Sequence, residues 1–99
     1  MPSRVPNPEI DAALDVIGDW QRAGKFLKGV FIFESFRGAF DFMIEVAEQA
    51  DVYQHHPNWQ NLYNKVTIEL TSHDFGGITD LDLEFAALIS RIAESRRQS

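Results

Sequence analysis

A short stretch of alternating residues in the second half of the chain limits the fold most strongly. Between positions 65 and 70, the apolar Val66, Ile68 and Leu70 alternate with polar residues. Successive side chains of a β-strand point to opposite faces of a sheet, so this period of two predicts a strand with one buried and one solvated face. Such a sheet needs helices over its apolar face, which indicates an α+β protein.

The first half of the chain predicts a helix, a β-hairpin and a second helix. Asn7 can cap the first helix, and Gly18 ends it. The hairpin turns at Gly24 and places Phe31 and Phe33 on one face. Ser35 can cap the second helix, whose apolar stripe we expect to face the core. That stripe consists of Phe36, Phe40, Met43, Ala47 and Ala50.

The second half predicts another hairpin, turning near Asn64, and a last helix after Gly77. Thr79 and Asp82 resemble a capping box at the start of that helix. Its apolar stripe consists of Leu81, Phe85, Leu88, Ile89 and Ile92. The expected order is α-β-β-α-β-β-α: a four-stranded antiparallel sheet with three helices packed on one face. We expect a single domain over positions 1–99, with an extended segment at 1–6 and a frayed tail at 94–99.

Composition excludes several classes of function. The formal net charge is −6, whereas direct nucleic-acid binding normally needs a basic face. The chain has no cysteine, which excludes disulfides, thiolate catalysis and Cys-based zinc sites. No apolar run approaches the roughly 20 residues that cross a bilayer. We therefore expect no membrane contact and a location in the cytoplasm or the nucleus.

All three histidines fall in two short segments, positions 51–57 and 72–74. With an unperturbed pKa of about 6.5, histidine both donates and accepts protons near neutrality. A hairpin turning near Asn64 would pair Trp59 with Leu70 and, by continuation, His56 with His73. Opposed residues have Cβ atoms about 4.5–5.5 Å apart, so we expect the imidazoles to share one site.

A carboxylate is expected beside this site. Asp51 precedes His55 by one helical turn, the spacing at which side chains meet on a helix. Its carboxylate can accept the imidazole N–H, fix the tautomer and favour the protonated ring.

Each of these residues also has a simpler interpretation. His55 can serve only as a cap of the helix C-terminus, His73 as an ordinary surface residue, and Asp82 as the capping partner of Thr79. Three histidines and an aspartate can also bind zinc. However, the side chains of the adjacent His55 and His56 diverge, so proton transfer without a metal is favoured.

At matched spacing, a long series of residues resembles the pterin-4a-carbinolamine dehydratase family. The most specific part is an acidic residue, three further residues and His-His-Pro, here positions 51–57. The resemblance extends from Trp20 to Ile92. It includes Phe31-Ile32-Phe33, Phe36, positions 39–43, Trp59, positions 63–66, Ser72-His73-Asp74, positions 76–79 and Asp82. Asp51 stands where glutamate is commoner, which shortens its reach, and Ser72 replaces a more usual threonine.

The resemblance implies dehydration of 4a-hydroxytetrahydropterin to quinonoid dihydropterin, a step of tetrahydrobiopterin recycling, with no metal or organic cofactor. By analogy, His55 and His73 are the acid/base pair, in either order, while His56 holds the pterin ring and Asp51 orients a histidine. Further substrate contacts are expected from Gln54, Thr71, Ser72, His73 and Asp74, with Trp20 as an aromatic wall.

The resemblance also implies protein partners. Members of the family form homodimers or homotetramers, and in animals they act as dimerisation cofactors of a homeodomain transcription factor. A hydroxylase is a further expected partner. The alternative function is therefore a protein-binding module in which the histidines are incidental.

Overall fold

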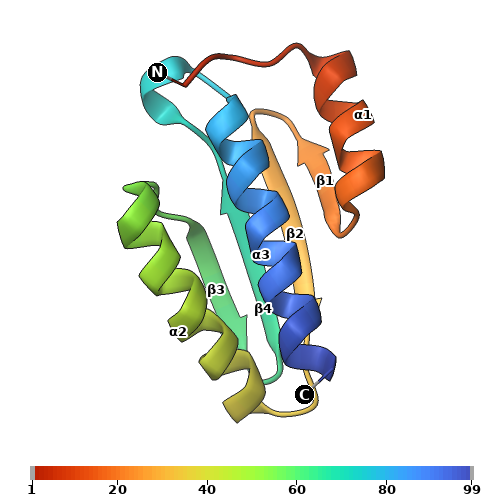
Figure 1. Cartoon of the computed structure of the whole chain (residues 1–99), viewed down its shortest axis with the longest axis vertical. Coiled ribbons are helices and arrows are strands. Elements are labelled where there is room, and N and C mark those ends of the chain that lie inside the picture. Colours follow the sequence, from red (N-terminus) through yellow and green to blue (C-terminus); the bar gives the residue numbers. More distant parts are fainter. Residues whose placement is uncertain (1, 99) are drawn as a thin grey trace.

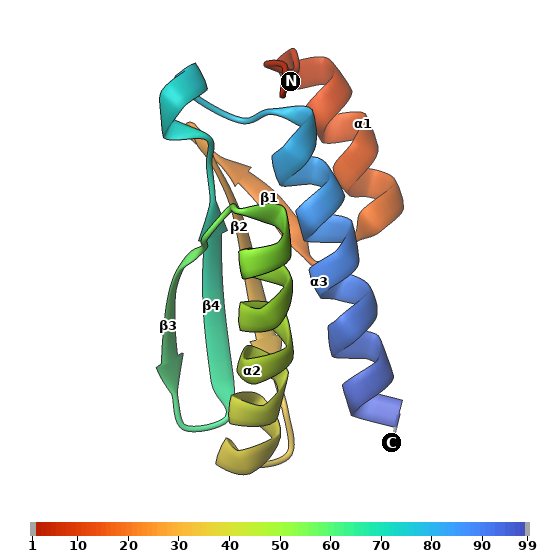
Figure 2. The same ribbon diagram turned by 60° about the vertical axis from the view of Figure 1, so that its left-hand side comes forward.

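In residues 2–98, the part of the chain that the computed structural model describes, three α-helices cover one face of a four-stranded antiparallel sheet (Figures 1 and 2). The elements are α1 (Asn7–Ile17), β1 (Trp20–Ala23), β2 (Phe26–Ile32), α2 (Phe36–Tyr53), β3 (Asn58–Leu62), β4 (Lys65–Leu70), a short 3₁₀ turn η1 (His73–Phe75) and α3 (Asp80–Gln98). This confirms the predicted α+β class and the order α-β-β-α-β-β-α.

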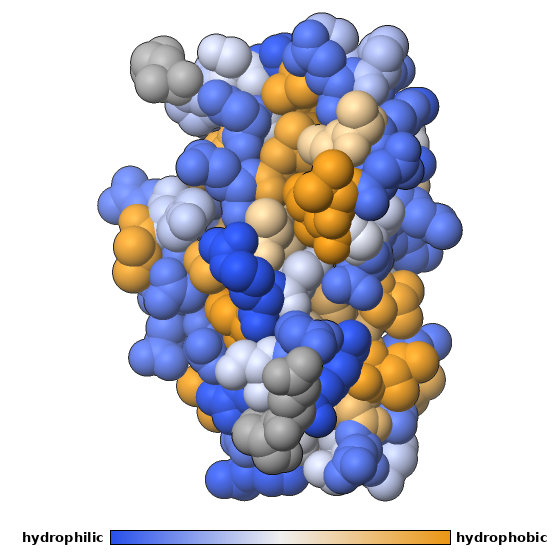
Figure 3. Space-filling view, turned by 45° about the vertical axis from the view of Figure 1, so that its right-hand side comes forward, coloured by the Kyte–Doolittle hydropathy of each residue, from blue (hydrophilic) through white to orange (hydrophobic). Residues whose placement is uncertain are grey.

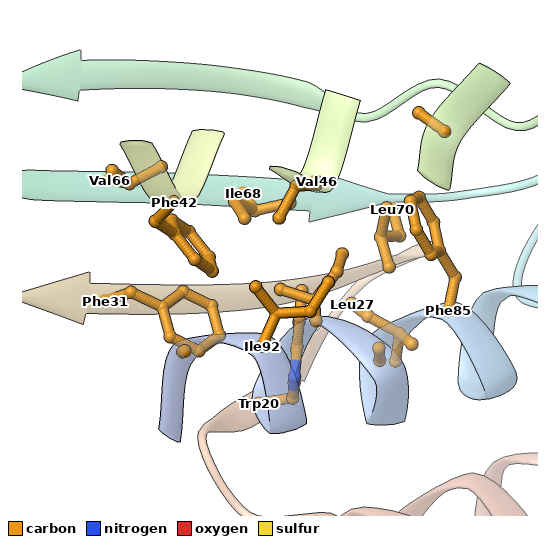
Figure 4. Close-up of a cluster of buried hydrophobic side chains, with 14 of the residues drawn as sticks. Trp20, Leu27, Phe31, Phe42, Val46, Val66, Ile68, Leu70, Phe85 and Ile92 are labelled. Atoms are coloured by element: carbon orange, nitrogen blue, oxygen red, sulfur yellow. The ribbon is translucent and has the colours of Figure 1, made fainter. Parts of the chain in front are cut away.

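The sheet has the strand order β1-β2-β4-β3, so the two hairpins meet along β2 and β4. The alternation that predicted β4 is confirmed, because Val66, Ile68 and Leu70 are all buried beneath the helices. Phe31 and Phe33 are likewise buried on the helix side. Apolar side chains from sheet and helices interlock in one cluster (Figure 4), in which the ring of Phe42 lies against those of both phenylalanines.

The register of the second hairpin differs from the prediction by two residues. Trp59 pairs with Ile68 rather than Leu70, because the turn contains only Tyr63 and Asn64. The amide of Asn64 donates to the carbonyl oxygen of Phe33 (2.9 Å), which fixes this turn against the end of β2. The predicted pairing of His56 with His73 is therefore wrong, and any approach of these rings depends on the loops beyond the strands.

Helix α2 begins as predicted but buries a different face. The hydroxyl of Ser35 accepts the N–H of Gly38 (3.0 Å), which confirms the cap. The residues that face the sheet are Ala39, Phe42, Val46 and Ala50. Of the predicted stripe, Phe36, Phe40 and Ala47 are exposed and Met43 is half-buried. Helix α2 thus has a second apolar row, Phe36, Phe40 and Ile44, that the described residues leave about half exposed.

Within the described residues, the boundaries of the first and last helices differ from the prediction. Pro6, not Asn7, precedes the first turn of α1. Positions 94–98 of the expected frayed tail are helical, since α3 continues to Gln98, and Ser99 lies outside the described residues. Arg96 donates to Glu45 of α2 (3.0 Å), which holds this last turn against the neighbouring helix.

The surface carries both polar and large apolar side chains. Figure 3 shows one side of the molecule, where hydrophilic residues predominate and apolar side chains emerge in separate patches. Among the described residues, no helix combines the length and the apolar character that crossing a membrane requires.

Candidate active site

The end of α2 directs two histidines out of the helix. Gln54, directly after the last helical residue, has a left-handed backbone (φ 52°), and the N–H of His55 reaches back to the carbonyl of Ala50 (3.0 Å). This is the hydrogen-bonding pattern of a Schellman motif, in which the chain turns sharply away from the helix axis. His55 and His56 therefore lie in the connection to β3, beyond the helix.

The side chain of His55 is bound to a buried carboxylate. Its Nε2–H donates to Oδ1 of Asp82, in the first turn of α3. The His55 side chain is only 12% exposed and that of Asp82 is fully buried. The other oxygen of Asp82 accepts the N–H of Thr79 (2.8 Å) and the hydroxyl of Ser72 (2.9 Å). A buried carboxylate needs such partners, and here they fix its orientation toward His55.

His56 has a different carboxylate partner. Its Nε2 donates to Oδ1 of Asp51 (3.0 Å), and both side chains are largely exposed. The predicted contact between Asp51 and His55 is therefore wrong. The spacing of one helical turn does not apply, because the left-handed backbone of Gln54 separates the two residues. Each of the two adjacent histidines thus has its own aspartate, one buried and one at the surface.

His73 reaches the same end of the molecule from the sheet. After β4, the N–H of Ser72 donates to the carbonyl of Gly77 (3.0 Å), and the intervening residues form η1. The turn closes through Gly76, whose left-handed backbone (φ 75°) favours glycine. The C-terminal end of α2, η1 and the start of α3 lie together at one end of the fold (Figure 1).

These elements surround an open pocket of about 430 Å³. It is lined by Pro2, Gln54, His55, His56, Thr71, Ser72, His73, Asp74, Phe75 and Leu81. All three histidines therefore border one hollow, although the register from which we expected this was wrong. Its volume lies within the range of roughly 300–1,000 Å³ that is usual for small-molecule sites.

Two of the predicted substrate contacts have their hydroxyls engaged within the protein. Ser72 binds Asp82, and Thr71 donates to the carbonyl of Lys25 (2.7 Å). Trp20 is not among the described residues that line the pocket. It is buried against Phe31, and its indole N–H donates to Ser90 of α3 (2.9 Å), so it belongs to the core.

Asp82 makes one contact that its capping pattern does not predict. Its predicted role as capping partner of Thr79 is confirmed, but its second oxygen is directed at His55. A signal was present in the helical spacing, since Asp82 lies on the same face of α3 as the buried Phe85 and Ile89. A carboxylate within a buried stripe requires polar partners from elsewhere in the fold.

A larger hollow, of about 570 Å³, lies at the opposite end of the molecule. It is bordered by the end of β2, the start of α2 and the end of α3, and none of its described lining residues is a histidine. Among the described residues, no three side chains of His, Cys, Asp or Glu gather closely enough to hold a metal ion. The histidine pocket is therefore the candidate for acid/base chemistry.

Comparison with known proteins identifies the family. Residues 3–92 match the family model described as pterin 4 alpha carbinolamine dehydratase. A protein of Synechococcus sp. (strain WH7803), provisionally named a pterin-4-alpha-carbinolamine dehydratase, is 44% identical over 92 residues, which cover 93% of this chain and 99% of that protein. A relative from Christiangramia forsetii with the same provisional name is 38% identical and covers 96% and 98% of the two chains.

Two solved structures share the fold. A transcriptional coactivator/pterin dehydratase from Brucella melitensis has a TM-score of 0.87 and 34% identity, covering 92% of this chain and 99% of its own. A pterin dehydratase-like protein, described as a RuBisCO assembly factor in the alpha-carboxysome, has a TM-score of 0.67 and 25% identity, covering 77% and 90%. From the family match along nearly its whole length, the chain belongs to the pterin-4-alpha-carbinolamine dehydratase family.

Proposed function

We propose that this protein dehydrates 4a-hydroxytetrahydropterin to quinonoid dihydropterin by histidine acid/base catalysis, as a step of tetrahydrobiopterin recycling. The observation that carries the proposal is the pocket in which His55 and His73 come together, the first of them bound to the buried Asp82. The membership of the chain in a pterin dehydratase family supports the choice of substrate.

The reaction needs two proton transfers. One imidazole, in its protonated form, gives a proton to the departing 4a-hydroxyl, and the C4a–O bond breaks to release water. The lone pair of N5 forms a C4a=N5 double bond, and the N5 proton passes to the other imidazole, which is neutral. Positioned acid–base groups of this kind contribute typically about 10²–10⁴-fold to a rate. These steps require no metal or organic cofactor.

We assign the two transfers to His55 and His73. His55 uses Nε2 toward Asp82, so Nδ1 is the ring nitrogen left for the substrate. His56, paired with Asp51 at the exposed rim, holds the pterin ring in place. Gln54 and Asp74 also line the pocket and supply polar contacts to the pterin edge.

The test is to replace His55 and His73 separately with alanine, then to measure carbinolamine dehydration and the oligomeric state. We expect each variant to lose about 10²-fold or more in kcat with an unchanged oligomer. Asp15→Asn, at an exposed position of α1, is the control for a change remote from the pocket. Unchanged turnover in both histidine variants would remove the acid/base proposal. Stoichiometric zinc that resists mild chelation would overturn the metal-free mechanism.

A second candidate function is protein binding. The observation that favours it is an exposed apolar row on α2, where the side chains of Phe36, Phe40 and Ile44 are 49%, 44% and 48% exposed. Of two structural neighbours, one is described as a transcriptional coactivator/pterin dehydratase and the other as a RuBisCO assembly factor. If the protein is only a binding module, the wild type will form its oligomer but will not dehydrate the carbinolamine in the experiment above. The expected partner is then a transcription factor, or a hydroxylase that produces the substrate.

We also propose that the working form is a homodimer or homotetramer joined through this row. Exposed apolar clusters of this kind usually mark protein contacts. The charges along α2 support pairing of two antiparallel copies, because Arg37 lies near its start while Glu48 and Asp51 lie near its end. Two copies in opposite directions bring these opposite charges together.

A further inference from the structure

The segment before α1 pairs with the segment that leads into α3. Arg4 and Thr79 form an antiparallel bridge. The N–H of Val5 donates to Ile78 (3.1 Å), and the N–H of Asp80 donates to the carbonyl of Ser3 (3.0 Å). We call residues 2–5 the N-terminal strap. It crosses the end of the molecule that holds the pocket (Figures 1 and 2), and its Pro2 lines that pocket.

The side chain of Arg4 lies against the turn that carries His73. Its Nη1 donates to the carbonyl of Phe75 (3.3 Å), the last residue of η1. A Cβ atom placed on Gly77 would come within 3.2 Å of Nε and 3.3 Å of Cζ of Arg4. The guanidinium therefore packs closely on the backbone of Gly77, where glycine leaves the room that it needs.

Backbone hydrogen bonds close the turn η1: the N–H of Phe75 donates to the carbonyl of Ser72 (3.0 Å), and the N–H of Gly76 donates to that of His73 (3.1 Å). It contains only three residues, none of them buried. Its base is fixed by the backbone pairing of Ser72 with Gly77, but the position of His73 within the turn depends on contacts made by the loop itself. An arginine that both donates to the loop carbonyl and covers the glycine next to it restricts that position.

We propose that Arg4 is a positioning residue that holds η1, and with it the imidazole of His73, at the pocket. The inference rests on the proposed function, in which His73 transfers a proton. Arg4 acts through His73, so its removal should reduce kcat and not substrate affinity. A misplacement of about 1 Å is enough to cost as much as about 10²-fold in a reaction that depends on orientation.

The experiment compares Arg4→Ala and Arg4→Lys in the intact chain. Because Arg4 is exposed, both variants should keep the fold, which thermal unfolding checks. We expect Arg4→Ala to lower kcat about tenfold with KM little changed. Arg4→Lys should recover part of the loss, since lysine can donate to the carbonyl of Phe75 but lacks the flat group that covers Gly77.

Double variants separate positioning from a general structural effect. In a His73→Ala background, Arg4→Ala should lower kcat no further, because the group it positions is already gone. In a His56→Ala background, the full tenfold loss should persist. An equal loss in both backgrounds, or no loss in the single variant, would overturn the proposal.

A measurement made without substrate tests the positioning role of Arg4 independently of the proposed dehydratase function. In NMR spectra of the free protein, Arg4→Ala should shift the ring proton signals of His73 and leave those of His56 unchanged. If the wild type fails to dehydrate the carbinolamine, the proposed function is wrong, and these spectra still decide whether Arg4 orders His73. Unchanged His73 signals would refute the positioning role.

Discussion

Two aspartates beside adjacent histidines differ in burial, and this difference predicts their importance. Asp82 is fully buried and fixes His55, whereas the Asp51 side chain is 82% exposed beside His56. We expect Asp82→Asn to lower kcat for carbinolamine dehydration about 10²-fold, because an amide cannot accept all the hydrogen bonds that the carboxylate accepts. Asp51→Asn should lower kcat far less, because an exposed ion pair contributes little free energy and therefore restrains the ring of His56 only weakly.

The two variants remove the same charge, so Asp51→Asn is a matched control for Asp82→Asn. Thermal unfolding should accompany the kinetics. Asp82→Asn leaves the N–H of Thr79 or the hydroxyl of Ser72 without a good acceptor. Since a buried donor without an acceptor costs about 1–3 kcal/mol, we expect the variant to unfold at a lower temperature. An equal fall of kcat in both variants would contradict the assignment of Asp82 as the residue that orients His55.

The sequence predicts which residues lie around the pocket better than it predicts which residues they contact. The three histidines were predicted to share a site because of their spacing and the family resemblance, and all three line the pocket. Their carboxylate partners were not predictable from helical spacing. Gln54 adopts a left-handed backbone. This conformation usually occurs at glycine, so the sequence gives no signal for it, and the resulting bend separates Asp51 from His55.

At the scale of elements, the patterns predicted which segments form helices and strands but not every face. Helix α2 has two apolar rows, one at Ala39, Phe42 and Val46 and one at Phe36, Phe40 and Ile44. Both rows have helical periodicity, so the sequence cannot say which one packs on the sheet. The hairpin register was missed for a similar reason: Tyr63 is not a typical residue for the positive φ (53°) that its two-residue turn requires.

An ion pair between two elements predicts how stability changes with pH. Arg22 of β1 binds the carboxylate of Asp11 of α1 through Nε and Nη2 (2.9 and 3.1 Å). The hydrogen bond from Arg22 lowers the pKa of Asp11, with a smaller favourable contribution from the opposite charge. A carboxyl group with a lowered pKa in the folded state stabilises that state above its unfolded pKa of about 3.9. The stabilisation is lost as the pH falls through the folded pKa.

We therefore expect Asp11→Asn to lower Tm at pH 7 and to differ less from the wild type as the pH falls below about 4. Asp15→Asn is the control, since it removes the same charge from the same helix at an exposed position. Thermal unfolding at several pH values measures both. A Tm difference for Asp11→Asn that stays constant down to pH 2 would show that the ion pair does not stabilise the fold.

At the scale of the whole molecule, the architecture followed from the sequence because one sheet face had to be covered. The alternation in β4 required a helical layer, and the helices expected on either side of the hairpins supplied it. The position of the site did not follow so directly. It arises because the end of α2, η1 and the start of α3 meet at one end of the fold, and the strand order that brings them together was not predicted.

The uncovered row of α2 predicts the behaviour of the whole molecule in solution. Phe36 and Phe40 stack with ring centroids 5.9 Å apart, and with Ile44 they form an apolar surface that a second copy can cover. We expect the wild type to run well above the 11.3 kDa of one chain in light scattering. Phe40→Glu should reduce the mass to that of a monomer, because association would then bury an unpaired charge.

Val16→Glu is the matched control, since Val16 is 87% exposed on α1 and lies outside this row. It introduces the same charge in place of another exposed apolar side chain and should leave the assembly intact. None of Phe36, Phe40 and Ile44 is among the described residues that line the pocket, so the monomeric Phe40→Glu variant should keep its dehydratase activity. A wild type that is monomeric, or a Phe40→Glu variant that still assembles, would place the oligomer interface, if there is one, on another surface. Loss of activity together with assembly would instead mean that a second copy completes the pocket.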